Sequence, residues 1–127
     1  MVRDPLADEE DPDLVEILGA LYDEDCRRIV EALEEPRTAS ELLERVDIPR
    51  STLYRKLDQL TDATLLYEGT EIRRDGSHAG RYEVDFREVV VTCDETRHLD
   101  VEVERPARRA DERLAELWSE VRKELEQ

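Results

Sequence analysis

Apolar residues recur at spacings of three and four over the first third of the chain, a pattern that predicts amphipathic helices. Two helices are expected before residue 36, the first starting near Pro12 and the second capped by the acidic run 23–25. Their inward positions are Leu14, Ile17, Leu18 and Leu21 in the first helix and Cys26, Ile29, Val30 and Leu33 in the second. Proline disfavours helical geometry in the residue before it, so Glu34-Glu35-Pro36 should end the second helix.

The stretch 38–60 predicts two short helices joined by a tight turn. Thr38, with Glu41 three residues later, forms a capping-box signature that opens the first of them. Asp47-Ile48-Pro49 breaks this helix, and proline suits the start of the next one, which carries an apolar face made by Leu53, Leu57 and Leu60. Such a pair is a helix-turn-helix, whose second helix can enter the DNA major groove N-terminus first. The alternative is a helical hairpin whose charged face is only solvated.

Residues beyond 64 change to the alternating pattern of strands. A strand is expected over 65–72, a turn over the glycine-containing basic stretch 73–80, and a strictly alternating strand over 81–86. Two strands around a basic loop directly after a helix-turn-helix form a wing, which separates a winged helix from an arbitrary helical pair. Residues 87–104 predict an additional hairpin beyond the wing.

A final helix is expected from Pro106, with a narrow apolar stripe close to a coiled-coil seam. The stripe consists of Ala107, Ala110, Leu114, Leu117, Val121 and Leu125, with Trp118 beside it. The stripe favours a dimerisation helix, because a small domain offers little uncommitted core for so long a stripe. One amphipathic helix packed on its own domain is the alternative.

The predicted fold class is therefore mainly α with a small β wing (α+β). It is a winged helix-turn-helix with an extra β-hairpin and a C-terminal dimerisation helix. Residues 1–11 form a flexible acidic arm, residues 12–86 the DNA-binding domain, and residues 87–127 the hairpin extension and dimerisation helix.

The charge is extreme and unevenly placed. The chain of 127 residues has 35 acidic and 19 basic side chains, a net charge of −16. Residues 1–44 carry −11 and residues 82–127 carry −6, whereas residues 45–81 carry +1. Only the middle segment, which holds the proposed reading helix, could readily approach an anionic polymer. The acidic surface resembles that of proteins from salt-loving archaea. Such a surface is tolerated there because multimolar salt shortens the Debye length to about 3 Å or less and removes most of the repulsion between its charges.

The candidate DNA contacts lie in the second helix of the pair and around the wing. They are Arg50, Ser51, Thr52, Tyr54, Arg55 and Lys56 in the helix, and Arg73, Arg74 and Arg81 in the wing. Basic and hydroxyl side chains can reach phosphates or base edges, and wing arginines suit a narrow minor groove. Alternatively, Tyr54 packs internally and the wing arginines pair with glutamates across strands. Because the basic helix side chains lie off the apolar face, replacing them should leave folding nearly unaffected.

The sequence offers little sign of catalytic, metal or membrane chemistry. It contains no P-loop, nucleophile elbow or dinucleotide-binding glycine pattern, so no enzyme and no cofactor are expected. Cys26 and Cys93 form no CxxC pair, and His78 and His98 are isolated, which argues against a metal site. No apolar run approaches about 20 residues and the acidic N-terminus lacks signal-peptide character, so a cytoplasmic protein is expected.

Residues 18–86 resemble the winged-helix domain of ArsR-type prokaryotic transcription regulators. Among these regulators, the chain is most similar in character to the small acidic ones of haloarchaea. The run LGALYDEDCRRIVEALEEPRTASELLERVDIPRSTLYRKLDQL carries the resemblance. It implies sequence-dependent binding of double-stranded DNA, usually as a homodimer. Two features depart from the family: its usual glycine is missing from the connector 62–65, and the cysteine pair of its metal sensors is missing from the helix at 38–46. The alternative function is a protein-interaction module that kept the fold but lost DNA contact.

Overall fold

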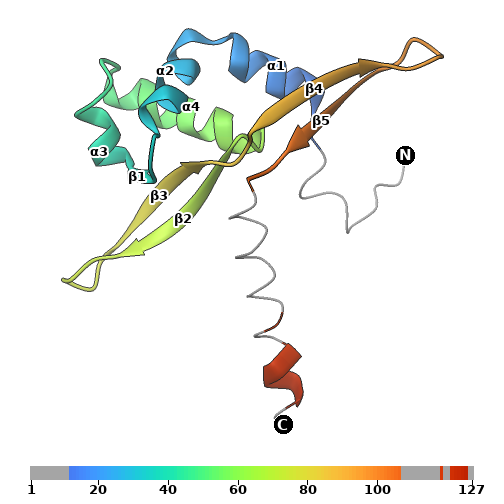
Figure 1. Ribbon diagram of the computed structural model, residues 1–127. Helices are drawn as coiled ribbons and strands as arrows, with labels where there is room; N and C mark the ends of the chain where they lie inside the picture. Colours follow the sequence, from blue (N-terminus) through green and yellow to red (C-terminus); the bar gives the residue numbers. More distant parts are fainter. Residues whose placement is uncertain (1–11, 107–117, 119–120, 126–127) are drawn as a thin grey trace.

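The computed structural model describes residues 12–106, Trp118 and residues 121–125, and it shows an α+β fold of helices and antiparallel sheets (Figure 1). The predicted arm 1–11 and Ala107, Ala110, Leu114 and Leu117 of the predicted stripe lie outside these residues. The elements are α1 (Leu14–Tyr22), α2 (Glu24–Ala32), β1 (Arg37–Thr38), α3 (Ala39–Leu43), α4 (Arg50–Asp62), β2 (Leu66–Ile72), β3 (His78–Val84), β4 (Glu88–Cys93) and β5 (Leu99–Glu104).

Helices α1 and α2 begin where an aspartate caps the chain, and both predicted helices are confirmed. The Asp13 carboxylate accepts from the amide of Glu16 at 3.0 Å. That of Asp23 accepts from the amide of Cys26 at 2.9 Å. Leu18 does not point inward as expected, because α1 buries the flank that carries Ile17 and Ala20, and 46% of Leu18 stays exposed.

Strand β1 was not predicted, because two residues are too short to show a period. It pairs with β3 through Arg37↔Tyr82 and Thr38↔Arg81 and so completes a three-stranded antiparallel sheet in the order β1-β3-β2. Arg37 is buried at this edge, where its Nε donates to the carbonyl of Ala32 at 3.0 Å. The sheet therefore joins the end of α2 to the hairpin that follows α4.

The β2–β3 hairpin has a shorter turn than the sequence predicted. Strand β3 begins at His78 rather than after Gly80, because pairing continues through Ile72↔His78, the two strand ends nearest the turn. Gly76 takes a left-handed backbone with φ +85°, which explains the Asp75-Gly76 pair at the tip. Asp75 also accepts from the amide and hydroxyl of Ser77, which fixes the turn from within.

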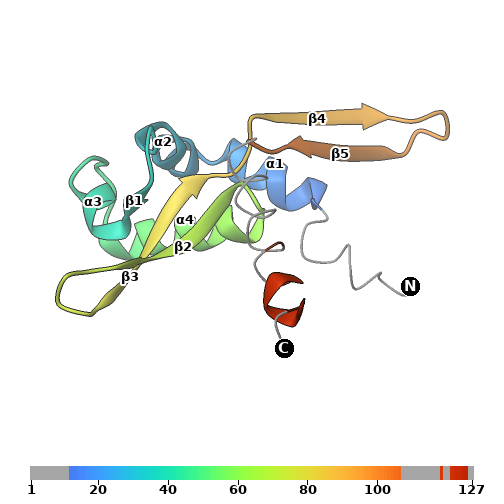
Figure 2. The same ribbon diagram turned by 60° about the horizontal axis from the view of Figure 1, so that its bottom comes forward.

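The predicted second hairpin is confirmed as β4–β5, a two-stranded sheet separate from the first. Two views show it extending away from the helical body, with α1 beside its base (Figures 1 and 2). Its base belongs to the main core, since Val101 is buried and Val89 and Val103 pack against the same cluster. The fully buried side chains of that cluster include Ile17, Ile29, Leu42, Leu53, Leu57, Leu60 and Leu65.

The end of β5 is fastened to the connector between α4 and β2. The Arg105 guanidinium donates to the carbonyl of Thr64, to its Oγ1 at 2.8 Å and to the carbonyl of Asp85 at 2.9 Å. Thr64 has a positive φ of 63° and lies in the connector 62–65, which contains no glycine. Of the part of the chain that the structure describes, no helix is long and apolar enough to cross a membrane.

Candidate nucleic-acid interface

Helices α3 and α4 and the turn between them form the predicted helix-turn-helix. The capping box is confirmed: Thr38 Oγ1 accepts from the Glu41 amide at 3.3 Å, and the Glu41 carboxylate accepts from the Thr38 amide at 3.2 Å. The hydrogen bond from that amide is the main reason that the pKa of Glu41 lies below its usual range. Ile48 is buried inside the turn, and Pro49 caps α4 without a side-chain hydrogen bond.

Helix α4 has one buried face and one mixed outward face. Leu53, Leu57 and Leu60 are fully buried, as the apolar spacing predicted. The opposite stripe, four, three and four residues apart, consists of Ser51, Arg55, Asp58 and Asp62, all exposed. The first half of the outward face is therefore polar and basic, and the second half is acidic.

The structure places four of the six predicted helix contacts on exposed surface. Arg50, Ser51, Tyr54 and Arg55 are exposed, and Thr52 is half-buried. Tyr54 does not pack into the core, which was the alternative considered for it.

Lys56 behaves differently from its neighbours. Its Nζ donates to Asp23 Oδ2 at 2.6 Å, and only 18% of the side chain remains exposed. The hydrogen bond from Lys56 is the largest reason that the pKa of Asp23 lies below its ordinary value. The expectation that replacing Lys56 leaves folding nearly unaffected did not foresee this ion pair, which links α4 to the start of α2.

A groove of about 240 Å³ separates the start of α3 and Tyr54 from the β2–β3 hairpin. Glu68 and Tyr82 line it, and the Tyr82 hydroxyl donates to Glu68 Oε1 at 3.3 Å. Burial is the main reason that the pKa of Tyr82 rises to about 12. A Cβ at Gly80 would lie 2.8 Å from Glu68 Oε1, so the flexible Glu68 side chain would have to shift to admit one. The groove thus presents a carboxylate as well as Arg73.

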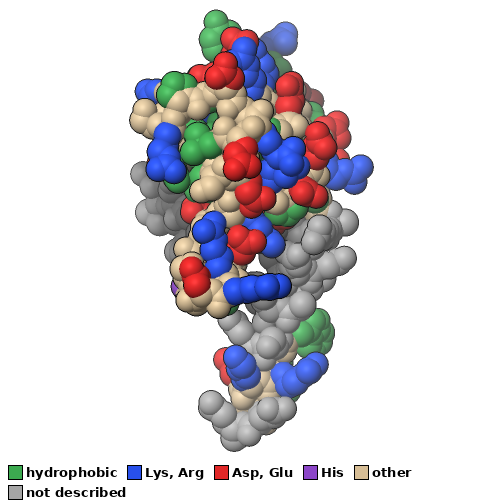
Figure 3. Space-filling view, turned by 90° about the vertical axis from the view of Figure 1, so that its left-hand side faces the viewer, with side chains coloured by type: hydrophobic (Ala, Val, Ile, Leu, Met, Phe, Trp, Pro, Cys, Tyr) green, Lys and Arg blue, Asp and Glu red, His purple; other side chains and the backbone are tan. Residues whose placement is uncertain are grey.

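The three predicted wing arginines do not form one cluster. Arg73 and Arg74 lie at the tip of the β2–β3 hairpin, and Arg73 Nε is 3.9 Å from Glu71 Oε2 in an exposed pair. Arg81 lies opposite Gly69 in the register, on the sheet face away from buried Tyr82. On the face with α3 and the hairpin tip, basic and acidic side chains are intermingled rather than gathered into one basic patch (Figure 3).

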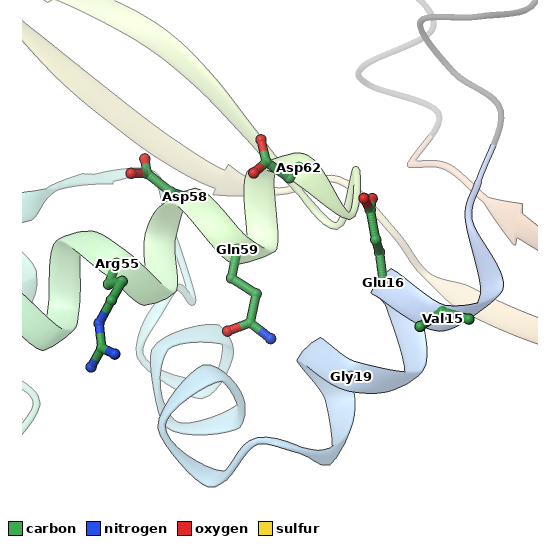
Figure 4. A pocket seen from close by; sticks show the side chains of 7 residues that line it. All are labelled: Val15, Glu16, Gly19, Arg55, Asp58, Gln59 and Asp62. Atoms are coloured by element: carbon green, nitrogen blue, oxygen red, sulfur yellow. The ribbon is translucent and has the colours of Figure 1, made fainter.

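A cavity of about 390 Å³ lies between α1 and the second half of α4. Figure 4 shows Arg55 at one end and the carboxylates of Asp58, Asp62 and Glu16 along it. This acidic stretch was not predicted, although the helical spacing from Arg55 to Asp58 and Asp62 places the three side chains on one face. The cavity repels anions, so a phosphate backbone is better accommodated near the start of α4.

The predicted dimer stripe is only partly within the described residues. Residues 121–125 are helical, and Trp118, Val121 and Leu125 are all exposed. Among the described residues, no three His, Cys, Asp or Glu side chains are arranged to hold a metal ion. Cys26 is buried, and burial is the largest reason that its pKa rises to about 11, whereas Cys93 is exposed.

A comparison with protein families agrees with this geometry. A family model described as a helix-turn-helix domain matches residues 21–67, from the end of α1 through α4 into β2. No curated protein matches the chain. Residues 21–67 are thus similar to a helix-turn-helix domain, in agreement with the arrangement of α3, the turn and α4.

Proposed function

We propose that the protein is a DNA-binding transcription regulator that acts as a winged-helix homodimer. The observation that carries this proposal is the exposed, polar and basic first half of α4 within a matched helix-turn-helix domain. In this arrangement α4 enters the major groove N-terminus first, and the β2–β3 hairpin is the wing. The acidic composition favours a protein that works in concentrated salt.

The roles of the side chains follow from their positions on α4. Arg50 and Arg55 reach phosphates or guanine edges, and Ser51 and Tyr54 contact phosphates or thymine methyl groups. Lys56 holds α2 against α4 and contributes to binding by fixing the helix, because its ammonium group is engaged by Asp23.

The wing arginines have separate tasks. Arg73 and Arg74 at the hairpin tip suit a narrow minor groove, where negative potential is strongest. Arg81 lies on the other sheet face and is suited to the phosphate backbone. The pairing of Arg73 with Glu71 is exposed and contributes little, so the Arg73 side chain remains available to DNA.

Dimerisation is assigned to the C-terminal stripe. An interhelical seam requires large apolar side chains exposed on a helix. Trp118, Val121 and Leu125 are such side chains, and all three residues are helical. A dimer would present two α4 helices to half-sites one or more helical turns apart.

One observation favours the second candidate, a protein-interaction module without direct DNA contact. Asp58 and Asp62 occupy the outward stripe of α4, where they repel phosphates. Arg55 lies next to them, so the two candidates differ in whether the basic half of α4 contacts DNA.

The test is fluorescence anisotropy with genomic duplex fragments in concentrated potassium chloride, using wild type and an Arg50→Ala/Arg55→Ala variant. Each base-reading arginine should contribute about 1–3 kcal/mol to specific binding. The matched control is Arg28→Ala/Arg97→Ala, which removes the same charge from exposed positions away from α4. Equal DNA affinity in wild type and the α4 variant would overturn the reading-helix assignment. Failure of every fragment to bind would favour the interaction module.

A further inference from the structure

The β4–β5 hairpin has one face made entirely of uncharged side chains. In the register, Val89 pairs with Val103, Val91 with Val101, and Cys93 with Leu99. Directly paired residues point to the same side of a sheet, so these six share one face, called here the inner face. The alternate pairs of the ladder point to the opposite face. They include Glu88↔Glu104 and Thr92↔Asp100, which make that face acidic.

The body of the molecule covers only half of this inner face. At the base, Val101 is buried and Val89 and Val103 pack on the core. Toward the tip, Val91 is 45% exposed, Leu99 is 52% exposed and Cys93 is exposed. A two-stranded hairpin alone is marginally stable in water, so this outer half gains from a surface packed against it.

Helix α1 carries a second uncharged strip. Val15, Leu18 and Tyr22 follow a spacing of three and four and form the α1 ridge. Val15 is 79% exposed and Tyr22 is 87% exposed, so the ridge faces outward. Large apolar side chains in such a row mark an interaction surface more often than isolated ones do.

We propose that the β4–β5 hairpin of one copy packs its inner face on the α1 ridge of a second copy, and reciprocally. The open half of the inner face and the α1 ridge are then covered by one contact that occurs twice about a two-fold axis. This inference rests on the homodimer of the proposed function, but it is independent of DNA binding.

Charge selects a second copy as the occupant. Residues 87–104 hold six acidic and two basic side chains, so the hairpin repels nucleic acid and anionic lipid. A basic partner would be attracted to the acidic outer face rather than to the uncharged inner face. Two copies of a chain with net charge −16 repel one another least where uncharged strips meet, and the hairpin and ridge supply such strips.

Size also favours a reciprocal contact. Six-residue strands are about 20 Å long and two of them about 10 Å wide, which gives a face of about 200 Å². Stable interfaces bury about 800 Å² per partner, so a single hairpin contact is too small. The body already covers half of this face, so the contact must occur twice and be joined by further surface, such as the C-terminal stripe, to reach that area.

Adjacent valines on β4 provide the first test. Val91 lies on the inner face and Val90 on the outer face, and their exposed fractions are similar, 45% and 38%. We expect Val91→Glu to weaken self-association at least tenfold in sedimentation equilibrium at high salt, and Val90→Glu to change it less than twofold. A second pair of variants repeats the comparison: Leu99→Glu alters the inner face from β5, and Thr92→Glu alters the outer face from β4. Circular dichroism verifies that each variant is folded. Equal effects on the two faces would overturn the proposal.

Cross-linking tests the geometry with a thiol that the chain already carries. Cys93 is exposed on the inner face, whereas Cys26 is buried, so a short bismaleimide should react at Cys93. A Tyr22→Cys variant should give covalent dimers that Cys93→Ser abolishes. Glu16→Cys, on α1 away from the ridge, should give few.

The remaining outcomes distinguish the hairpin–ridge contact from other ways of forming a dimer and from the proposed DNA binding. Covalent dimers of wild type through Cys93 alone would show that two hairpins pack on each other, which would overturn the ridge contact. Loss of dimer in Leu117→Glu with Val91→Glu unchanged would assign assembly to the C-terminal stripe alone, also against the proposal. Persistent Tyr22→Cys cross-links in a protein that binds no DNA would support the hairpin contact while refuting the regulator.

Discussion

At the scale of single residues, Asp23 organises the helical body. It ends α1 and caps α2, and its two oxygens serve different partners. Oδ1 accepts from the amide of Cys26, and Oδ2 accepts from Lys56, 33 residues further along the chain. One carboxylate therefore fixes the start of a helix and its position against α4.

The ion pair between Asp23 and Lys56 predicts a pH-dependent contribution to stability. Folding lowers the pKa of Asp23 below 3.8, so its stabilising contribution is present above about pH 3.8 and is lost as pH falls through the lower folded pKa. Asn keeps a cap but loses the charge, so Asp23→Asn should lower the free energy of unfolding by about 1 kcal/mol near neutral pH. The difference from wild type should shrink in acid.

Urea unfolding at high salt, repeated from pH 7 toward pH 3, measures this difference. Asp25→Asn is the matched control, because Asp25 lies in the same first turn of α2. An Asp23→Asn effect that is the same at every pH would contradict the role assigned to the charge.

At the scale of elements, Arg105 is the joint of the fold. It lies directly after β5 and binds the connector between α4 and β2 through Thr64 and the end of β3 through Asp85. The amide of Asp85 in turn donates to the carbonyl of Leu65 at 2.9 Å. Three separate elements are thus held by one guanidinium group, which fits several acceptors at once.

Thr64 predicts a measurable coupling at this joint. A left-handed backbone costs a side-chain-bearing residue about 1–2 kcal/mol, which glycine avoids. The hydrogen bond that Arg105 donates to the Thr64 hydroxyl oxygen opposes that cost, since hydrogen bonds to charged groups contribute about 1.5–3 kcal/mol. Thr64→Gly should therefore be nearly neutral in wild type but stabilising by about 1 kcal/mol in an Arg105→Ala background. A double-mutant cycle by chemical denaturation checks this, and additive effects would contradict it.

Local patterns in the sequence predicted the elements, and contacts between distant residues did not follow from them. Some features depend only on residues close together in the chain, so they are visible in the sequence. They are the capping box at Thr38, the apolar face of α4 and the alternation of the later strands. The Lys56–Asp23 pair and the Arg105 joint link residues 33 and 41 positions apart, and no period encodes them. Strand β1 was missed for the related reason that only its partner β3 defines it.

At the scale of the whole molecule, the charge distribution sets how the protein meets an anionic polymer. The net charge is −16, and the segment 45–81 carries only +1. The structure adds that carboxylates lie beside the candidate contacts: Asp58 follows Arg55 on α4, and Glu68 lines the groove next to Arg73. In the proposed DNA complex, salt is needed to screen these carboxylates from the phosphates.

This arrangement predicts an unusual dependence of DNA affinity on salt. A basic DNA-binding protein loses affinity steeply as salt rises, because phosphate contacts release condensed counterions. Here screening of the acidic surface and uptake of potassium between carboxylates and phosphates oppose that loss. We expect the logarithm of affinity to stay flat or rise with the logarithm of potassium chloride concentration. The measurement is a salt titration of specific-site affinity, with circular dichroism in parallel because refolding alone could imitate a rise.

Removing carboxylates near the contact face should restore a falling slope. Asp58→Asn/Asp62→Asn acts on the outward stripe of α4, and substitutions at Glu68, Glu71 and Asp75 act on the wing. Asp94→Asn/Asp100→Asn is the matched control, since it removes the same charge from the projecting hairpin, away from α4. If the global charge governed the slope, both pairs would change it equally, whereas a local effect changes it only near α4. A steep negative slope in fully folded wild type would show that the local arginines outweigh the acidic surface, and the prediction would be wrong.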